Sequence, residues 1–314
     1  MIIADAVQSV LSIVIMIGVG YFLAHKGWLD DKASKLFSKL VVSVSLPALM
    51  FSNLMKNFNK DMLMESKLGI GIAFFTMFLA YGVSILIARL LKIPPNRRGL
   101  FQSMFALSNT IFIGLPVNLS LFGEKSVPMV LLYYIANTTT FWTIGVYNIR
   151  KDSGRNDQEG IFTLNTVKRI FSPPLMGFLV ALIFILLKIM LPKFIINSCR
   201  SIGNLTTALS MFFIGIIIHE INIKDIRFDK NMIMLLIGRF IFCPLIVFSA
   251  CYYFDVPLLM KKVFVIEAAM PVMTQSAIVA QAYEADYKYA TVMVSVTTIA
   301  SLIFIPFYTA LLSL

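Results

Sequence analysis

The stretch Asn109-Thr110-Ile111-Phe112-Ile113-Gly114-Leu115-Pro116 (NTIFIGLP) interrupts an otherwise apolar segment with an amide, a hydroxyl, a glycine and a proline. A second stretch, Ala268–Ser276 (AAMPVMTQS), does the same in the other half of the chain. Proline removes a backbone donor and clashes with the carbonyl one turn back, so each stretch is expected to break a helix. Backbone freed in this way is costly in lipid unless it is buried in protein or lines a wet cavity. Two such breaks at corresponding places point to the substrate site of a membrane carrier.

The composition places the chain among membrane proteins. Of its 314 residues, 59% are hydrophobic and only 14% are charged, and the mean hydropathy is +0.85. Soluble domains are about half apolar and about a quarter charged. The formal charge of +11 therefore indicates basic membrane-flanking loops and not a nucleic-acid partner. Cys199, Cys243 and Cys251 lack the spacing of a metal site, so we expect no metal and no cofactor.

Apolar stretches of about twenty residues suffice to cross a bilayer, and ten such stretches can be read along the chain. They cover residues 4–24, 34–56, 66–91, 98–122, 126–149, 165–190, 196–219, 230–253, 257–283 and 287–312. We therefore expect an all-α polytopic membrane protein with a five-helix repeat at 1–150, a short cytoplasmic linker at 151–164 and a second repeat at 165–314. Because five is an odd number, the second repeat would be inverted relative to the first, as in many secondary transporters.

Basic residues predict the orientation of these spans. Seventeen Lys and Arg side chains flank the spans on one side of the membrane and nine flank them on the other. The more basic side is expected to face the cytoplasm. The chain would then be a multi-pass protein of the plasma membrane, or of a bacterial inner membrane, with both termini outside.

The broken helices supply the candidate substrate-binding residues. Half-helix N-termini carry partial positive charge and unpaired N–H groups, so they attract anions. If the breaks cross near the middle of the membrane, four half-helix ends and several polar side chains converge there. The candidates are Asn109, Thr110, Gly114, Pro116, Asn137, Arg239, Pro271, Thr274, Gln275 and Ser276. The alternative is that both prolines form ordinary kinks that neighbouring helices relieve.

Charged side chains inside a membrane span are candidate functional groups. Arg239 and Glu267 both lie near the middle of their spans. We expect one of three roles for these residues. They form a buried ion pair with each other, or Arg239 neutralises a substrate carboxylate, or Glu267 carries a coupling ion or proton. The polar run at 137–140 (NTTT) either makes interhelical hydrogen bonds or lines the pathway.

Four motifs resemble the auxin efflux carrier family. They are Asn109–Pro116 (NTIFIGLP), Ala268–Pro271 (AAMP), Leu46–Phe51 (LPALMF) and Gly20–Leu29 (GYFLAHKGWL). This family includes plant PIN-type auxin exporters and bacterial malate-permease-like proteins, which carry small organic anions. The resemblance implies two inverted repeats whose broken spans 4 and 9 cross at their prolines. It also implies a scaffold domain of spans 1, 2, 6 and 7, which forms a homodimer, and a moving transport domain of spans 3–5 and 8–10.

The resemblance assigns Asn109 and Pro116 to the span 4 crossing motif and Pro271 to the span 9 proline. It implies a secondary transporter that moves a small organic anion by alternating access, with an elevator-type movement of the transport domain. The short linker departs from the long regulatory loop of the plant exporters, so the substrate can be malate, another small carboxylate or an auxin-like acid. Sodium, a proton or the membrane potential alone can drive the transport.

Two related transporter classes stay open. A sodium-coupled bile-acid-type symporter needs a cluster of oxygens that Gln275 and Glu267 could supply in part. A sodium/proton antiporter usually has aspartates at the crossing, where this chain has Asn109 and Thr110.

A membrane-embedded sensor is the alternative outside the transporters, although such sensors normally carry a soluble output domain. The sequence lacks a His-Glu-x-x-His motif, paired membrane aspartates and a G-x-x-x-x-G-K loop. We therefore expect neither an enzyme nor an ATP-driven pump.

Overall fold

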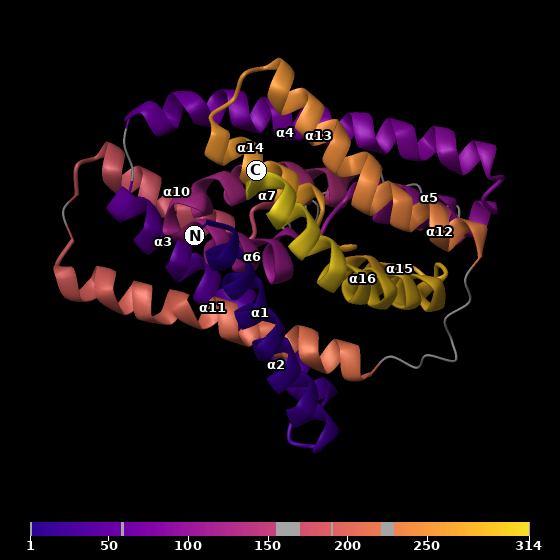
Figure 1. The fold of residues 1–314 in the computed structure, drawn as a ribbon, viewed down its shortest axis with the longest axis horizontal. Helices are drawn as coiled ribbons and strands as arrows, with labels where there is room; N and C mark the ends of the chain where they lie inside the picture. The colour runs from indigo at the N-terminus through magenta and orange to yellow at the C-terminus, as the bar shows by residue number, and fades with distance from the viewer. Residues whose placement is uncertain (1, 58–59, 155–169, 190, 221–228, 314) are drawn as a thin grey trace.

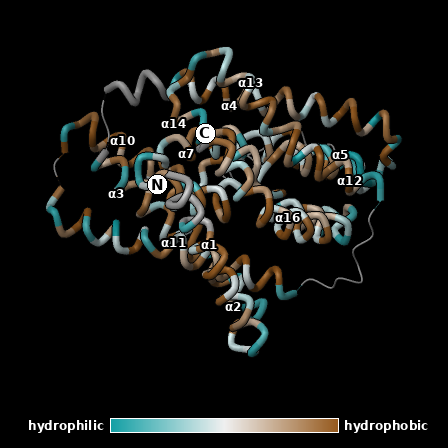
Figure 2. The backbone as a smooth tube through the Cα atoms, viewed as in Figure 1, coloured by the Kyte–Doolittle hydropathy of each residue, from teal (hydrophilic) through white to brown (hydrophobic). Residues whose placement is uncertain are grey.

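The computed structural model describes residues 2–57, 60–154, 170–189, 191–220 and 229–313. Within these ranges the chain is helical, and its extended pairing is limited to one isolated bridge between Ser108 and Val272. Hydrophobic residues run along most of the helices, and hydrophilic residues gather near helix ends (Figure 2). Five helices are long and apolar enough to cross a membrane, namely Asp31–Lys56, Lys67–Leu90, Lys193–His219, Lys230–Tyr253 and Tyr287–Leu312. With the shorter apolar helices Leu11–His25 and Pro173–Leu186, these elements form a helical multi-pass membrane protein.

The first half of the chain contains α1 (Ile2–His25), α2 (Asp31–Leu40), α3 (Leu46–Asn57), α4 (Lys60–Leu90), α5 (Pro95–Ala106), α6 (Leu115–Phe122), α7 (Val127–Thr140) and α8 (Val146–Asp152). The second half contains α10 (Pro173–Leu186), α11 (Lys193–His219), α12 (Lys230–Ile237), α13 (Cys243–Tyr253), α14 (Leu258–Ala268), α15 (Gln275–Ala282) and α16 (Tyr287–Ser313). Most of the expected linker at 151–164 and the start of the expected span at 165–190 lie outside the described residues.

Wide π-helical turns precede three prolines of the described chain, Pro47, Pro116 and Pro244. Val41–Ser45 joins α2 to α3, Thr110–Gly114 leads into α6, and Gly238–Phe242 joins α12 to α13. In each case a proline occupies the second position of the helix that follows. A proline ring clashes with the carbonyl one turn back and offers no N–H. A wider turn relieves this conflict, and such turns commonly occur at kinks and functional sites.

The helices pack in two groups. α1, α3, α10 and α11 pack against one another, while α4, α5, α7, α8, α13 and α14 form a second set of contacts. In Figure 1, α4 and α11 lie at opposite edges of the molecule, with α6 and α7 between them. The contact between α1 and α11 requires glycine, because a Cβ at Gly20 would lie 2.7 Å from Phe212 Cα. Small residues allow this close approach of membrane helices.

Side chains beyond the expected spans hold the start of α5 in place. The Asp152 carboxylate accepts hydrogen bonds from Gly99 N at 2.9 Å and Leu100 N at 2.7 Å. Burial raises the pKa of Asp152 from 3.8 to about 6, while these two backbone bonds oppose the rise. Arg97 donates through Nε and Nη2 to Asp286 Oδ2 at 2.9 and 2.6 Å. The start of α5 is thereby anchored to α8 and to the segment before α16.

Candidate functional site

Two helices are broken, and their extended segments cross each other. α5 ends at Ala106 and helical structure resumes at Thr110, while α14 ends at Ala268 and α15 begins at Gln275. The segments between these ends meet in the antiparallel bridge described above. At the same place, the backbone N of Asn109 donates to the carbonyl oxygen of Pro271 at 2.8 Å. Both expected breaks are therefore present and touch, but the first lies at residues 107–109, upstream of the π-helical turn that precedes Pro116.

The Asn109 side chain strengthens this crossing. Its Nδ2 donates to Thr274 Oγ1 at 3.0 Å, and its Oδ1 accepts a bond from Phe112 N at 3.1 Å. The second bond caps the helix that begins at Thr110, as asparagine commonly does at this position. A single buried amide thus joins the two breaks and orders the start of one half-helix.

Side chains from other helices satisfy the backbone freed at the crossing. Asn137 of α7 accepts from Ser108 N at 3.0 Å and donates to Ser108 O at 2.9 Å. Val272 N donates to Thr297 Oγ1 of α16 at 3.2 Å. These bonds replace those that a continuous helix would make, which extended backbone at membrane depth requires. Asn137, predicted as a substrate-binding residue, is placed as a support of the crossing.

Arg239 lies where the first halves of both broken helices end. Its Nη1 donates to Phe105 O at 2.9 Å and its Nη2 donates to Ala268 O at 2.6 Å, and its side chain is fully buried. Helix C-termini carry partial negative charge, and the planar guanidinium can reach two acceptors at once. Among the salt bridges of the described residues, none joins Arg239 to Glu267.

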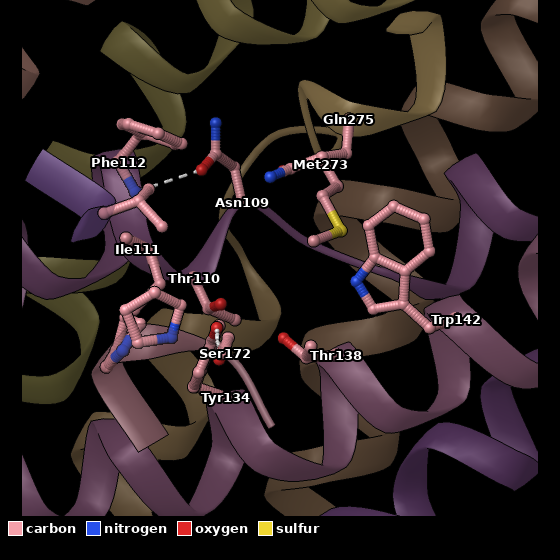
Figure 3. Close-up of a pocket in the computed structure, with 13 residues that line it drawn as sticks. Asn109, Thr110, Ile111, Phe112, Tyr134, Thr138, Trp142, Ser172, Met273 and Gln275 are labelled. Carbon is pink, nitrogen blue, oxygen red and sulfur yellow. Dashed lines mark hydrogen bonds between the residues drawn. The ribbon is translucent and has the colours of Figure 1, made fainter. Parts of the chain in front are cut away.

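A cavity of about 290 Å³ opens beside the crossing, and Figure 3 shows its wall. The first turns after both breaks, one face of α7 and the start of α10 surround it. Its lining residues are Val42, Asn109, Thr110, Ile111, Phe112, Tyr134, Thr138, Trp142, Ser172, Pro173, Pro174, Met273 and Gln275. None of these residues is charged. The cavity is thus apolar over much of its surface, with a few amide and hydroxyl groups, as small-molecule sites usually are.

The electrostatic character of this cavity comes from helix ends. Thr110 and Gln275 begin the second halves of the two broken helices and both line it. These ends carry partial positive charge, whereas the negative ends of the first halves are capped by Arg239. The arrangement therefore favours a negatively charged group without a cationic side chain in the wall.

A second cavity of about 570 Å³ adjoins the first. Val42, Phe112 and Gln275 line both cavities and therefore lie between them. Unlike the first, the second cavity has charged side chains in its wall, namely Asp31, Lys35, Lys39 and Glu220. The polar cavity can serve as an approach to the smaller, uncharged one.

The predicted residues separate into two sets. Asn109, Thr110 and Gln275 line the smaller cavity, while Thr274 lines the larger one and binds the Asn109 amide. The remaining predicted residues are not in the wall of the smaller cavity. They are Gly114, Pro116, Asn137, Arg239, Pro271 and Ser276, together with Glu267, whose carboxyl is buried behind the crossing.

Sequence reasoning missed several wall residues, among them two aromatic residues, Tyr134 and Trp142, and the hydroxyl residue Ser172. Tyr134 and Ser172 share a hydroxyl–hydroxyl hydrogen bond of 2.8 Å. Tyr134, Thr138 and Trp142 recur every fourth residue, so they lie on one helical face. That period, next to the polar run at 137–140, is the signal that would have identified this wall.

Comparison with known proteins identifies the family. A family model described as a membrane transport protein matches residues 5–309. The chain is 27% identical over 301 residues to an uncharacterized transporter of Methanocaldococcus jannaschii, covering 94% of this chain and 95% of that protein. It is 26% identical over 317 residues to an uncharacterized transporter of Methanothermobacter thermautotrophicus, covering 99% of this chain and all of that protein. The chain therefore belongs to the membrane transport protein family, the family of the auxin efflux carriers that its motifs resemble.

Proposed function

We propose that this membrane transporter is a secondary carrier of a small organic anion, and that the uncharged cavity beside the crossing is its substrate site. The observation that carries the proposal is the polarity of the four half-helix ends. The two positive ends open on the cavity, whereas Arg239 caps the two negative ends away from it. A carboxylate placed near Asn109, Thr110 and Gln275 would be attracted by both positive ends.

The lining of the smaller cavity also indicates how many carboxylates the transported anion carries. A single carboxylate can be balanced by helix ends and neutral donors, but a second one would be buried without a cation. Trp142, Phe112 and Met273 provide an apolar and aromatic surface next to the polar corner. These features favour one carboxylate on an apolar body, such as an auxin-like acid, over a dianion such as malate.

The proposed mechanism is alternating access in ten spans arranged as two inverted repeats, inserted in the plasma membrane with both termini outside. Its support is that the cavity lies between two groups of helices. Val42, Ser172 and Pro173 enter it beside α3 and α10, whereas the crossing and α7 form the other wall. We assign α1, α2, α3, α10 and α11 to a scaffold that forms a homodimer. The crossing and the remaining helices would form the moving transport domain.

Uptake into liposomes tests this proposal. Purified protein would be reconstituted, and uptake of radiolabelled indoleacetate and radiolabelled malate would be measured under an imposed membrane potential. We expect saturable uptake of indoleacetate, and about tenfold weaker apparent affinity in Gln275→Ala, as for the loss of about 1.4 kcal/mol of polar contact. Gln275 is chosen because no hydrogen bond of the crossing described above uses its side chain.

Two further variants sharpen the result. Asn109→Ala should lower both affinity and folded yield, because its amide also joins the two breaks. Asn204→Ala, on an exposed part of α11, is the matched control and should behave as the wild type. Normal uptake by folded Gln275→Ala and Asn109→Ala protein would remove the cavity as the substrate site.

A further inference from the structure

The carboxyl group of Glu267 occupies an unusual position. Glu267 is fully buried in the last turn of α14. Its carboxyl group lies flat against Gly114 of the other broken helix, where an added Cβ would overlap both carboxyl oxygens and Cδ. A glycine at this point is what allows the carboxyl to reach across the crossing.

Asn118 of α6 is the hydrogen-bond partner of this carboxyl. Its Nδ2 donates to Glu267 Oε1 at 2.8 Å and also to Gly114 O at 2.9 Å. Two buried atoms of the pair then have no hydrogen-bond partner within the described part of the chain, namely Glu267 Oε2 and Asn118 Oδ1. Buried polar atoms without partners are rare and call for an explanation.

A single proton explains both atoms. A carboxylate buried with one hydrogen bond and no counter-ion is costly, and Arg239 is committed to two backbone carbonyls. A proton on Glu267 Oε2 would remove the charge, and the acid O–H would be a donor for Asn118 Oδ1. With the existing N–H···O bond, it would close a cyclic pair between a carboxylic acid and an amide.

We propose that Glu267 is a proton-binding site, neutral in this conformation and paired with Asn118, and that its proton is the coupling ion. The coupling part rests on the proposed transport function. The ring joins α14, the first half of one broken helix, to α6 in the second half of the other. Loss of the proton leaves a carboxylate oxygen beside an amide oxygen, which repel each other and weaken the contact between the half-helices. Proton release is thereby linked to a change at the crossing that holds the substrate cavity.

Other ionisable groups lie on the elements that pack against α14. They include Tyr133 of α7, Cys243 and Cys251 of α13, Tyr308 of α16, and Glu124 and Lys125 of the turn after α6, while Arg239 binds the end of α14 itself. Cys243 Sγ donates to Phe105 O, Tyr308 donates to Phe240 O, and Glu124 pairs with Lys56. Asn118 is the side chain that bonds to the Glu267 carboxyl in the described residues.

Infrared spectroscopy tests the protonation directly. The spectrum of reconstituted wild-type protein at neutral pH should contain the carbonyl band of a buried carboxylic acid, which is isolated by subtracting the spectrum of each variant. Glu267→Gln should lose that band, whereas Glu124→Gln, which removes an exposed carboxylate, should retain it. Asn118→Leu should shift the band toward that of an acid without hydrogen bonds. If no acid band disappears in Glu267→Gln, Glu267 is ionised and the proposal is wrong.

Flux measurements test the coupling separately. In liposomes carrying a pH gradient, indoleacetate also crosses as the neutral acid, so uptake into protein-free liposomes is subtracted. The remaining, protein-dependent initial rate of uptake should rise with the pH gradient for wild-type and Glu124→Gln protein. Folded Glu267→Gln should exchange indoleacetate at a rate that does not depend on the gradient, because glutamine mimics the neutral acid permanently. Equal dependence on the gradient in Glu267→Gln would overturn the coupling. If the wild type moves neither indoleacetate nor malate, the transport proposal fails for these anions, while the infrared result still decides the proton site.

Discussion

Gly114→Ala is a severe test of how closely the two broken helices approach each other. The new methyl group would overlap the carboxyl of Glu267, which is fully buried and bonded to Asn118. Overpacking a core costs about 1–3 kcal/mol, and displacing the carboxyl loses a hydrogen bond worth about 1 kcal/mol. Alanine recovers roughly 0.5–1 kcal/mol over glycine in a helix. We therefore expect a net loss of about 1–3 kcal/mol in the free energy of unfolding.

The measurement is denaturant unfolding of purified protein in detergent. The matched control is Gly71→Ala in α4, where an added Cβ meets no atom within 4 Å, so its stability should be unchanged or slightly higher. A second comparison uses the Glu267→Ala background, in which space is available for the methyl group. Gly114→Ala should cost close to nothing there. An equal loss in both backgrounds, or a loss no larger than that of Gly71→Ala, would refute the close packing of these two residues.

Two further predictions concern the ends of the broken helices. Arg239→Gln should lower the free energy of unfolding by about 2–4 kcal/mol, because two charge-assisted bonds to buried carbonyls are lost. Binding of indoleacetate by the protein that stays folded should be unchanged, and weaker binding at unchanged melting temperature would instead place Arg239 at the substrate. The pKa of Asp152 is raised from 3.8 to about 6, so the folded state binds this proton more tightly than the unfolded state does. The resulting stabilisation is fully present below pH 3.8 and is lost as the pH rises through about 6. Asp152→Asn should therefore flatten the melting temperature between these two pH values, and an unchanged profile would argue against this linkage.

Composition and the placement of prolines predict the class of protein and the regions in which two of its helices break. A hydropathy this high with so few charges excludes a soluble fold, because apolar helices of this length need lipid or protein around them. Proline inside an apolar run disrupts the helix locally, whatever the neighbours are. A helix break in the region of each proline and the family could therefore be predicted without a structure. The family was confirmed, and the first break lies upstream of its proline, at residues 107–109.

The side chains that meet at the crossing could not be predicted, because they depend on how the helices pack. Arg239 was expected beside Glu267 or a substrate, but it lies on the carbonyls of both half-helices. The pairing of Glu267 with Asn118 had no sequence signal. The four-residue period that ends at Trp142 marks one helical face, but it does not show that this face forms the wall of a cavity. The physical reason is that helix periodicity defines the face of each residue but not the helix that this face meets. A buried polar group takes whichever partner the packing brings within hydrogen-bond distance.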